Sequence, residues 1–433
     1  MNTIDPWLAG AEAANEDVPA WFADLRRAGC DAFAARGLPT TRDEDWKYTN
    51  LAPLTRIAFE SKLHANGSSA IPGNTISLGG RRLVFVNGRY AAEQSVTDGT
   101  ASEALVMSLR DGLAQVPDLV RAHLGSRIAL NEQPLAALNT AHLEQGAVVY
   151  VPRNVALDAP VELVFFAAAN RPVVAHPRIL VVLEAGASAT VVERYIGDDS
   201  QPYLTNVVTE AIVGPNASLR HVKTQEEGAA AFHLASIWAH QAPSSRFRSC
   251  SISLGAALAR TDISTLLDGE GAECDLDGLY IGRNQQHVDH HTIIDHRSPH
   301  ASSRELYKGV LDDAATGVFN GKVFVRQDAQ KSNAQQMNKN LLLSDSATVD
   351  TKPQLEIFAD DVKCSHGATV GRLDATALFY LRSRGIDAQR AREILVYAFA
   401  NEMLDRIAIE PLRIDLERTL GARFAEASVR AAA

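Results

Sequence analysis

The chain has little cysteine, and its cysteines are far apart. The 433 residues include only four, Cys30, Cys250, Cys274 and Cys364, with no Cys-x-x-Cys pair. Such spacing excludes the dense disulfide framework of a small secreted domain and favours a reducing compartment. It also excludes a metal cluster held by four cysteines of this chain in the manner of a ferredoxin.

The sequence also lacks long apolar runs and an excess of basic residues. No run approaches the roughly 18 apolar residues of a membrane-spanning helix. Residues 1–7 (MNTIDPW) lack the basic and apolar parts of a signal peptide. The net charge is -10 and the isoelectric point is near 5.7, whereas nucleic acid is bound by basic surfaces. We therefore expect a cytoplasmic protein that binds neither membranes nor nucleic acid.

Motifs of self-contained catalysis are missing as well. There is no Gly-x-Ser-x-Gly elbow and no recognisable triad or spaced pair of carboxylates. Gly317, Gly321 and Lys322 do not complete a phosphate-binding loop, because the glycines are four residues apart and Val323 follows the lysine. Asn320-Gly321 instead predicts a tight turn. We expect no enzyme here, and any nucleotide-driven step must come from another protein.

The pattern of elements divides the chain into three regions. Residues 1–135 mix helix and loop. An amphipathic helix is predicted over Asp17–Arg36, a strand over Arg82–Val86 with a turn at Asn87-Gly88, and helical spacing over Leu105–Leu124.

Residues 136–373 form the core of the predicted fold, which is mainly β. Short alternating runs follow one another without helices, and several begin after corners at Gly186, Gly214, Gly255 and Gly271. Recurring corners favour a β-solenoid, in which each coil buries its face against the next, with a β-sandwich as the alternative. The predicted strands include Ala147–Val151, Val161–Phe166, Ile179–Leu183, Ala189–Tyr195, Val207–Val213, Ser218–Lys223, Ala235–His240, Arg246–Leu254 and Ala259–Leu267.

Residues 374–433 return to helical spacing. A break is predicted at Gly385, and Asp387 is a suitable N-cap for the following helix. Two apolar stripes have four-residue spacing: Leu395, Phe399, Met403 and Ile407, and then Leu412, Leu416, Leu420 and Phe424. The stripes either pack against each other or leave one face for a partner.

One strand carries the strongest candidate site. Residues 362–371 (VKCSHGATVG) alternate regularly, so Cys364 and His366 lie on one face, roughly 6.6 Å apart along the strand. Thiolate and imidazole are ligands for zinc, copper and iron. Taken alone, the pair is also compatible with an inert buried cysteine.

A second histidine-rich segment, residues 287–300, looks less like a metal site. His290 and His296 share one face of a strand, whereas His291 and Asp295 share the other. This division favours a structural role. The amide side chains of segment 327–340 are likewise expected to stack along the coils and to satisfy one another.

Several segments together resemble the SufD-type scaffold subunits of the SUF iron–sulfur cluster assembly machinery. They span essentially the whole chain: residues 42–49 (RDEDWKYT), 307–310 (YKGV), 318–322 (VFNGK), 336–345 (QMNKNLLLSD), 362–371 and 377–385 (ALFYLRSRG). The resemblance implies a right-handed parallel β-helix between an N-terminal α/β region and a C-terminal helical region.

The resemblance also implies partners and site residues. It implies a heterodimer with SufB through the β-helix, one SufC ATPase bound by the C-terminal helices, and a possible homodimer of the isolated chain. His366, followed by Cys364, would bind iron or a nascent cluster at the interface, with further ligands from SufB. The cysteine of the SufB scaffold falls near Asn338, and Gly367 replaces the glutamate that follows its histidine. A reduced flavin in the complex is possible.

Two other functions remain open from the residues alone. One is a carbohydrate-active β-helix enzyme, which requires acidic residues clustered on one face of the solenoid. The other is a zinc enzyme that uses the histidines of residues 287–300.

Overall fold

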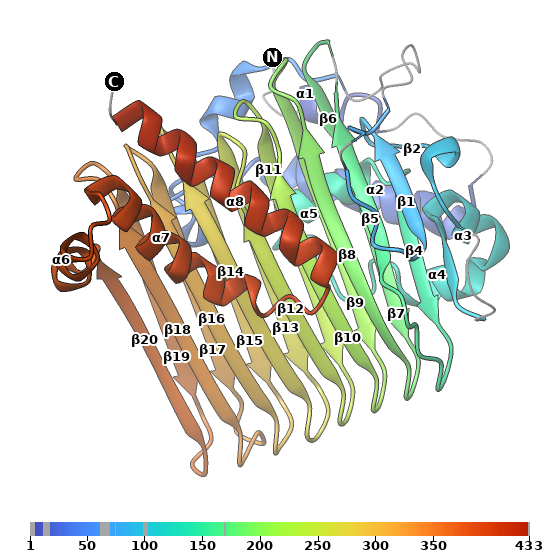
Figure 1. Ribbon diagram of the computed structural model, residues 1–433. Coiled ribbons are helices and arrows are strands. Elements are labelled where there is room, and N and C mark those ends of the chain that lie inside the picture. Colours follow the sequence, from blue (N-terminus) through green and yellow to red (C-terminus); the bar gives the residue numbers. More distant parts are fainter. Residues whose placement is uncertain are drawn as a thin grey trace.

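The computed structural model describes residues 5–11, 18–60, 70–73, 75–97, 103–168 and 170–431. Two 10-stranded sheets, counted within these residues, run side by side along one axis. Helices of the N-terminal region lie at one end of the stack, and the C-terminal helices cross the outer face of one sheet (Figure 1).

Strand order shows how the two sheets are built. The first sheet contains, in spatial order, β2 (Arg89–Tyr90), β1 (Arg82–Val86), β5 (Val161–Ala167), β8 (Ser188–Gly197), β10 (Ser218–Glu226), β12 (Arg246–Ser253), β14 (Glu273–Gly282), β16 (Ser302–Leu311), β18 (Asn333–Leu342) and β20 (Lys363–Gly371). The second contains β19 (Thr348–Ile357), β17 (Thr316–Val325), β15 (His287–His296), β13 (Leu258–Leu267), β11 (Phe232–Gln241), β9 (Tyr203–Val213), β7 (Arg178–Leu183), β4 (Gly146–Val151) and β3 (Leu105–Ser108), with β6 (Val173–Ala175) beside β9.

Successive strands from β7 to β20 alternate between the two sheets, and each strand from β7 to β18 pairs in parallel with the strand two further along the chain. This connectivity is that of a solenoid, because each pair of strands completes one coil. The predicted β-solenoid is therefore confirmed, and the alternative β-sandwich is wrong.

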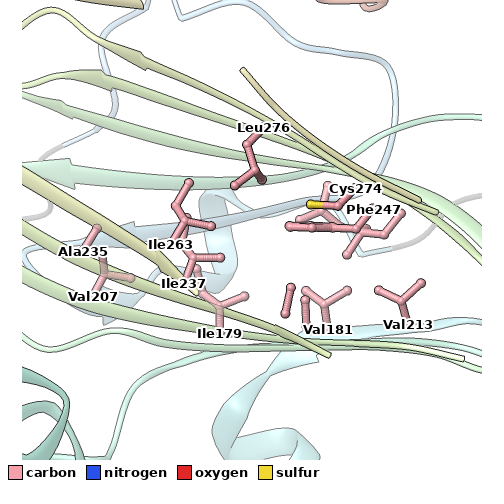
Figure 2. Close-up of a cluster of buried hydrophobic side chains, with 14 of the residues drawn as sticks. Ile179, Val181, Val207, Val213, Ala235, Ile237, Phe247, Ile263, Cys274 and Leu276 are labelled. Atoms are coloured by element: carbon pink, nitrogen blue, oxygen red, sulfur yellow. The ribbon is translucent and has the colours of Figure 1, made fainter. Parts of the chain in front are cut away.

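The core lies between the sheets and follows from the alternation along each strand. Ile237 and Ile263 face inward from the second sheet, and Phe247, Cys274 and Leu276 face them from the first (Figure 2). All five side chains are almost fully buried. Stacking of successive coils thus produces one continuous apolar interior.

The corners use glycine in two different ways. Gly186 and Gly271 have positive φ angles of 71° and 70°, as expected for the left-handed conformation. Gly255 instead permits a close approach, because a Cβ there would lie 2.1 Å from the carbonyl oxygen of Glu227. At that corner the positive φ falls on Ala256.

One predicted turn is wrong. Asn320 and Gly321 lie in the middle of β17, where they pair with His291 and Thr292 of β15, respectively, on one side and with β19 on the other. The parallel pairing of three consecutive coils overrides the local preference of Asn-Gly for a turn.

The N-terminal region supplies helices and also extends both sheets. Its helices are α1 (Asp5–Leu8), α2 (Ala20–Arg36), α3 (Leu109–Gln115), α4 (Pro117–His123) and α5 (Pro134–Ala141). The predicted helix over Asp17–Arg36 is found as α2, although Asp17 lies outside the described residues. The predicted hairpin is also present, with Asn87 and Gly88 at φ 48° and 78° between β1 and β2. Leu105–Leu124 begins with β3 rather than a helix, because Leu105 and the next three residues pair with β4.

The C-terminal helices are α6 (Ala375–Ser383), α7 (Ala388–Leu404) and α8 (Glu410–Ala431). The side chain of Asp387 caps α7 by accepting a hydrogen bond from the backbone N–H of Arg390, as predicted. Gly385, at φ 85°, separates α6 from α7.

The two apolar stripes are covered by the chain itself to different extents. The stripe on α8 is buried in one cluster with α7 and the outer face of the first sheet: Leu412, Leu416, Leu420 and Phe424 with Val222, Cys250, Ile252 and Leu279. On α7 the buried positions are Val396, Ala400, Met403 and Leu404, whereas Leu395 and Phe399 are only half-buried. The stripe on α8 therefore fastens this helix to the solenoid, whereas the stripe on α7 is covered fully only in its second half, at Met403 and Ile407.

Candidate functional site

The two candidate ligands lie on the last strand of the solenoid. β20 is an edge of the first sheet, and β19 is an edge of the second, so no further coil of the described chain covers them. The parallel register sets Cys364 beside Ala334 and His366 beside Gln336. Both neighbours are buried, so Cys364 and His366 lie on the inward face of β20, at the open end of the interior.

Cys364 and His366 are buried to different extents. Cys364 is half-buried against the end of the core. Burial raises the pKa of its thiol, and the backbone N–H of Ala334 opposes part of that rise. His366 is exposed, because no coil follows it. The edge therefore presents one imidazole to solvent and one thiol just below the surface.

The described residues hold no group of three or more His, Cys, Asp or Glu side chains close enough to bind a metal ion. Cys364 and His366 thus form an incomplete ligand set. Zinc and iron bound by such ligands usually require four or more donors.

The histidines of residues 287–300 are divided between the two faces of β15. His290 is inside the solenoid between Tyr280 and Tyr307, and His296 bonds Ser303 at 2.9 Å. Burial lowers the pKa of His290 to about 3 and that of His296 to about 4. Outside, His291 contacts Asp289 at 3.1 Å, and Asp295 binds Arg326. These contacts support the structural role.

Three amides of β18, those of Gln336, Asn338 and Asn340, are buried in the interior, whereas Asn333 and Gln335 are exposed on the other face. Gln336 Nε2 donates to Glu305 at 2.7 Å, and Asn338 Nδ2 donates to the carbonyl of Tyr307 at 3.2 Å. Asn340 donates to Asn338 at 2.5 Å. The prediction that amides satisfy one another is thus too narrow, since a carboxyl and a backbone carbonyl also take part.

Glu305 was not expected from the sequence. It is 1% exposed, and burial raises the pKa of its carboxyl to about 7. The alternation of Ser303, Glu305 and Tyr307 within β16 is the signal that would have placed it inside.

The segment 42–49 joins the N-terminal region to the outer face of the second sheet. Asp45 binds Lys322 at 2.9 Å, and the hydroxyl of Thr49 donates to Asp289 at 2.5 Å. Trp46 lies against Arg260. These contacts give the charged and aromatic motif a structural role, because it holds the N-terminal region to the coils.

Comparison with known proteins agrees with this architecture. Residues 4–163 match the family model of the SufBD protein N-terminal region. Residues 165–399 match that of the SUF system FeS cluster assembly, SufBD core domain. The chain belongs to the SufBD family.

Individual relatives span nearly the whole chain. An iron–sulfur cluster assembly SufBD family protein of Synechocystis is 36% identical over 92% of this chain and 90% of its own length. The iron–sulfur cluster assembly protein SufD of Escherichia coli is 34% identical over 90% of each chain. SufD of Bacillus subtilis is 28% identical over 92% of this chain and 93% of its own.

Membership of the SufBD family also bears on the other predictions. The carbohydrate-active enzyme and the zinc enzyme are not supported, because the family is a different one and the histidines are divided between two faces. No helix in the described parts is long and apolar enough to cross a bilayer.

Proposed function

We propose that this SufBD family protein is a non-catalytic, cytoplasmic scaffold subunit for iron–sulfur cluster assembly. Iron and the nascent cluster are its cargo, which it helps to acquire at the open end of the solenoid. The observation that carries the proposal is the position of Cys364 and His366 on the inward face of the edge strand β20.

The incomplete ligand set supports a shared site. A SufB-type subunit placed against the open end would contribute the missing thiolate or carboxylate donors. The neutral imidazole of His366 and the thiolate of Cys364 would bind iron from this side, with proton release as the thiol binds. A reduced flavin in the complex would supply electrons.

The edges of the last coil suit a protein partner. β19 and β20 each leave one row of backbone groups unpaired within the described chain, and such edges accept further strands. Apolar side chains are exposed nearby, among them Met337, Ile357, Phe358 and Val370. We propose that SufB binds here and that the isolated chain can pair with a second copy through the same surface.

The SufC ATPase would bind the C-terminal region, residues 374–433. Because the stripe of α8 is buried against the solenoid and that of α7 is at least half-buried, we place the docking surface on another face. Phe379 and Tyr380 of α6 are 72% and 58% exposed. Large exposed aromatic side chains of this kind are enriched at protein interfaces.

The test is the iron and acid-labile sulfide content of the anaerobically purified complex, co-expressed with SufB and SufC. We expect His366→Ala to lower both while all subunits still co-elute, and Cys364→Ala to have a smaller or equal effect. Ser365→Ala is the matched control, because Ser365 is exposed on the opposite face of β20. Wild-type iron content in His366→Ala would leave this chain as a structural partner only.

A further inference from the structure

One column of inward-facing side chains leads to His366. The register stacks Leu276, Glu305, Gln336 and His366 on four consecutive strands of the first sheet. Neighbouring parallel strands are about 4.8 Å apart. Leu276 still belongs to the apolar interior (Figure 2), so the column becomes polar over its last three positions, toward the open end.

The side chain of Gln336 is held in one place from two sides. Its Nε2 donates to Glu305 at 2.7 Å. From the opposite sheet, Gly321 leaves the space that the amide fills, because a Cβ there would lie 2.3 Å from Nε2 and 3.0 Å from Cδ of Gln336. This close approach explains a glycine in the middle of β17.

The other end of the amide has no partner. Gln336 is 2% exposed, and its Oε1 is buried without a hydrogen-bond partner among the described residues. A buried carbonyl oxygen left unpaired is unfavourable, because it has lost its hydrogen bonds to water without a replacement. The residue beside Gln336 on the outer side of the column is His366.

We propose that Gln336 is a positioning residue for His366: its Oε1 accepts the ring N–H of the imidazole, and Glu305 and Gly321 hold the amide for this purpose. The inference rests on the proposed function, in which His366 binds iron. A metal-bound imidazole coordinates through one nitrogen and donates from the other, and the acceptor fixes its tautomer and orientation. Gln336 thus holds the exposed imidazole of His366 in one orientation, whereas a free side chain would sample several rotamers.

The experiment measures the affinity of the complete complex with SufB and SufC for Co²⁺, followed anaerobically by absorbance. Gln336→Leu removes the acceptor and keeps much of the volume. Asn340→Leu is the matched control, because Asn340 is a buried amide on the same strand but lies beside Val370. Gly321→Ala provides a second variant that leaves Gln336 itself in the chain and displaces its amide. His366→Ala is measured alongside, and thermal unfolding of every variant is recorded.

Loss of an outer partner of a metal ligand weakens binding roughly 10–100-fold. We expect a loss in this range for Gln336→Leu and Gly321→Ala, and wild-type affinity for Asn340→Leu. If Gln336→Leu and Gly321→Ala bind Co²⁺ as Asn340→Leu does while His366→Ala binds weakly, the role of Gln336 is wrong and the proposed function stands. Wild-type affinity for Co²⁺ in His366→Ala would contradict both the proposed function and the role of Gln336.

Discussion

The guanidinium carbon of Arg260 lies 3.7 Å from the centre of the Trp46 ring. Arg260 belongs to β13 and is 2% exposed, and it also binds Asp289 at 3.0 Å and the carbonyl of Asp45 at 2.6 Å. The N-terminal motif and the second sheet are therefore joined through a cation that is stacked and hydrogen-bonded at the same time. Such a contact combines aromatic burial with fully desolvated polar bonds.

This contact predicts that replacing Trp46 causes a large loss of stability. Trp46→Ala should destabilise the protein by about 3 kcal/mol, because it removes a buried ring and exposes Arg260 to solvent. Thermal unfolding of the purified chain measures the loss, with Tyr48→Ala as the control, since Tyr48 is 37% exposed in the same motif. Equal melting temperatures for the two variants would contradict the anchoring role.

Glu305 predicts a specific dependence of stability on pH. Its folded pKa of about 7 exceeds the ordinary value of 4.5 because of burial. Between these values the folded state keeps a proton that the unfolded state has lost, so the free energy of unfolding falls as pH rises. Glu305→Gln should remove this fall and stabilise the protein at pH 8 by up to about 3 kcal/mol, with little effect at pH 4.

The measurement is the denaturation midpoint of both proteins across this pH range. Glu356→Gln, at an exposed position of β19, serves as the control. Parallel curves for wild type and Glu305→Gln would show that the buried carboxyl has an ordinary pKa.

The stripe on α8 predicts a loss of stability from truncation. Leu416 is 0% exposed between α8 and the first sheet. Leu416→Ala should cost about 3 kcal/mol, because it leaves a cavity in this layer. Ile414, on the same helix, is 43% exposed, and Ile414→Ala should change stability by less than about 0.5 kcal/mol. A similar loss in both variants, measured by chemical denaturation, would disagree with the packing of α8.

The exposed aromatics of α6 predict the site of ATPase docking. The double change Phe379→Ser and Tyr380→Ser should leave the melting temperature unchanged and abolish co-purification of SufC, because it removes apolar contact area from the surface only. Val96→Ser, at another exposed apolar position outside the C-terminal region, is the control. Full recovery of SufC with the double variant would move the docking surface to another part of residues 374–433.

Local patterns were sufficient for much of the fold. Alternation identified the strands of the solenoid, and the change to helical spacing after residue 374 identified α6 to α8, because burial on one face imposes these periods on the sequence. The same alternation put Cys364 and His366 on one face before any neighbour was known. Asp387 could be predicted as an N-cap because an N-cap side chain accepts a hydrogen bond from the backbone of a residue only two or three positions further on.

Properties that depend on residues distant in the sequence could not be predicted from local patterns. Asn320-Gly321 resembles a turn, yet it lies within a strand, because pairing with residues about thirty positions away on both sides outweighs the local signal. The stripe containing Leu416 could equally have faced a partner, and only its contact with the outer face of the first sheet shows that it is covered.

The open end of the solenoid is the clearest case. Residues 276, 305, 336 and 366 lie 29, 31 and 30 positions apart, and because this spacing varies with the length of each corner, the sequence does not fix which of them are paired. Alternation alone assigns each of them to an inward face and leaves its depth undefined. The stacking of coils decides that Glu305 is buried, that Gln336 lies between two sheets, and that His366 is exposed, because burial depends on whether another coil follows.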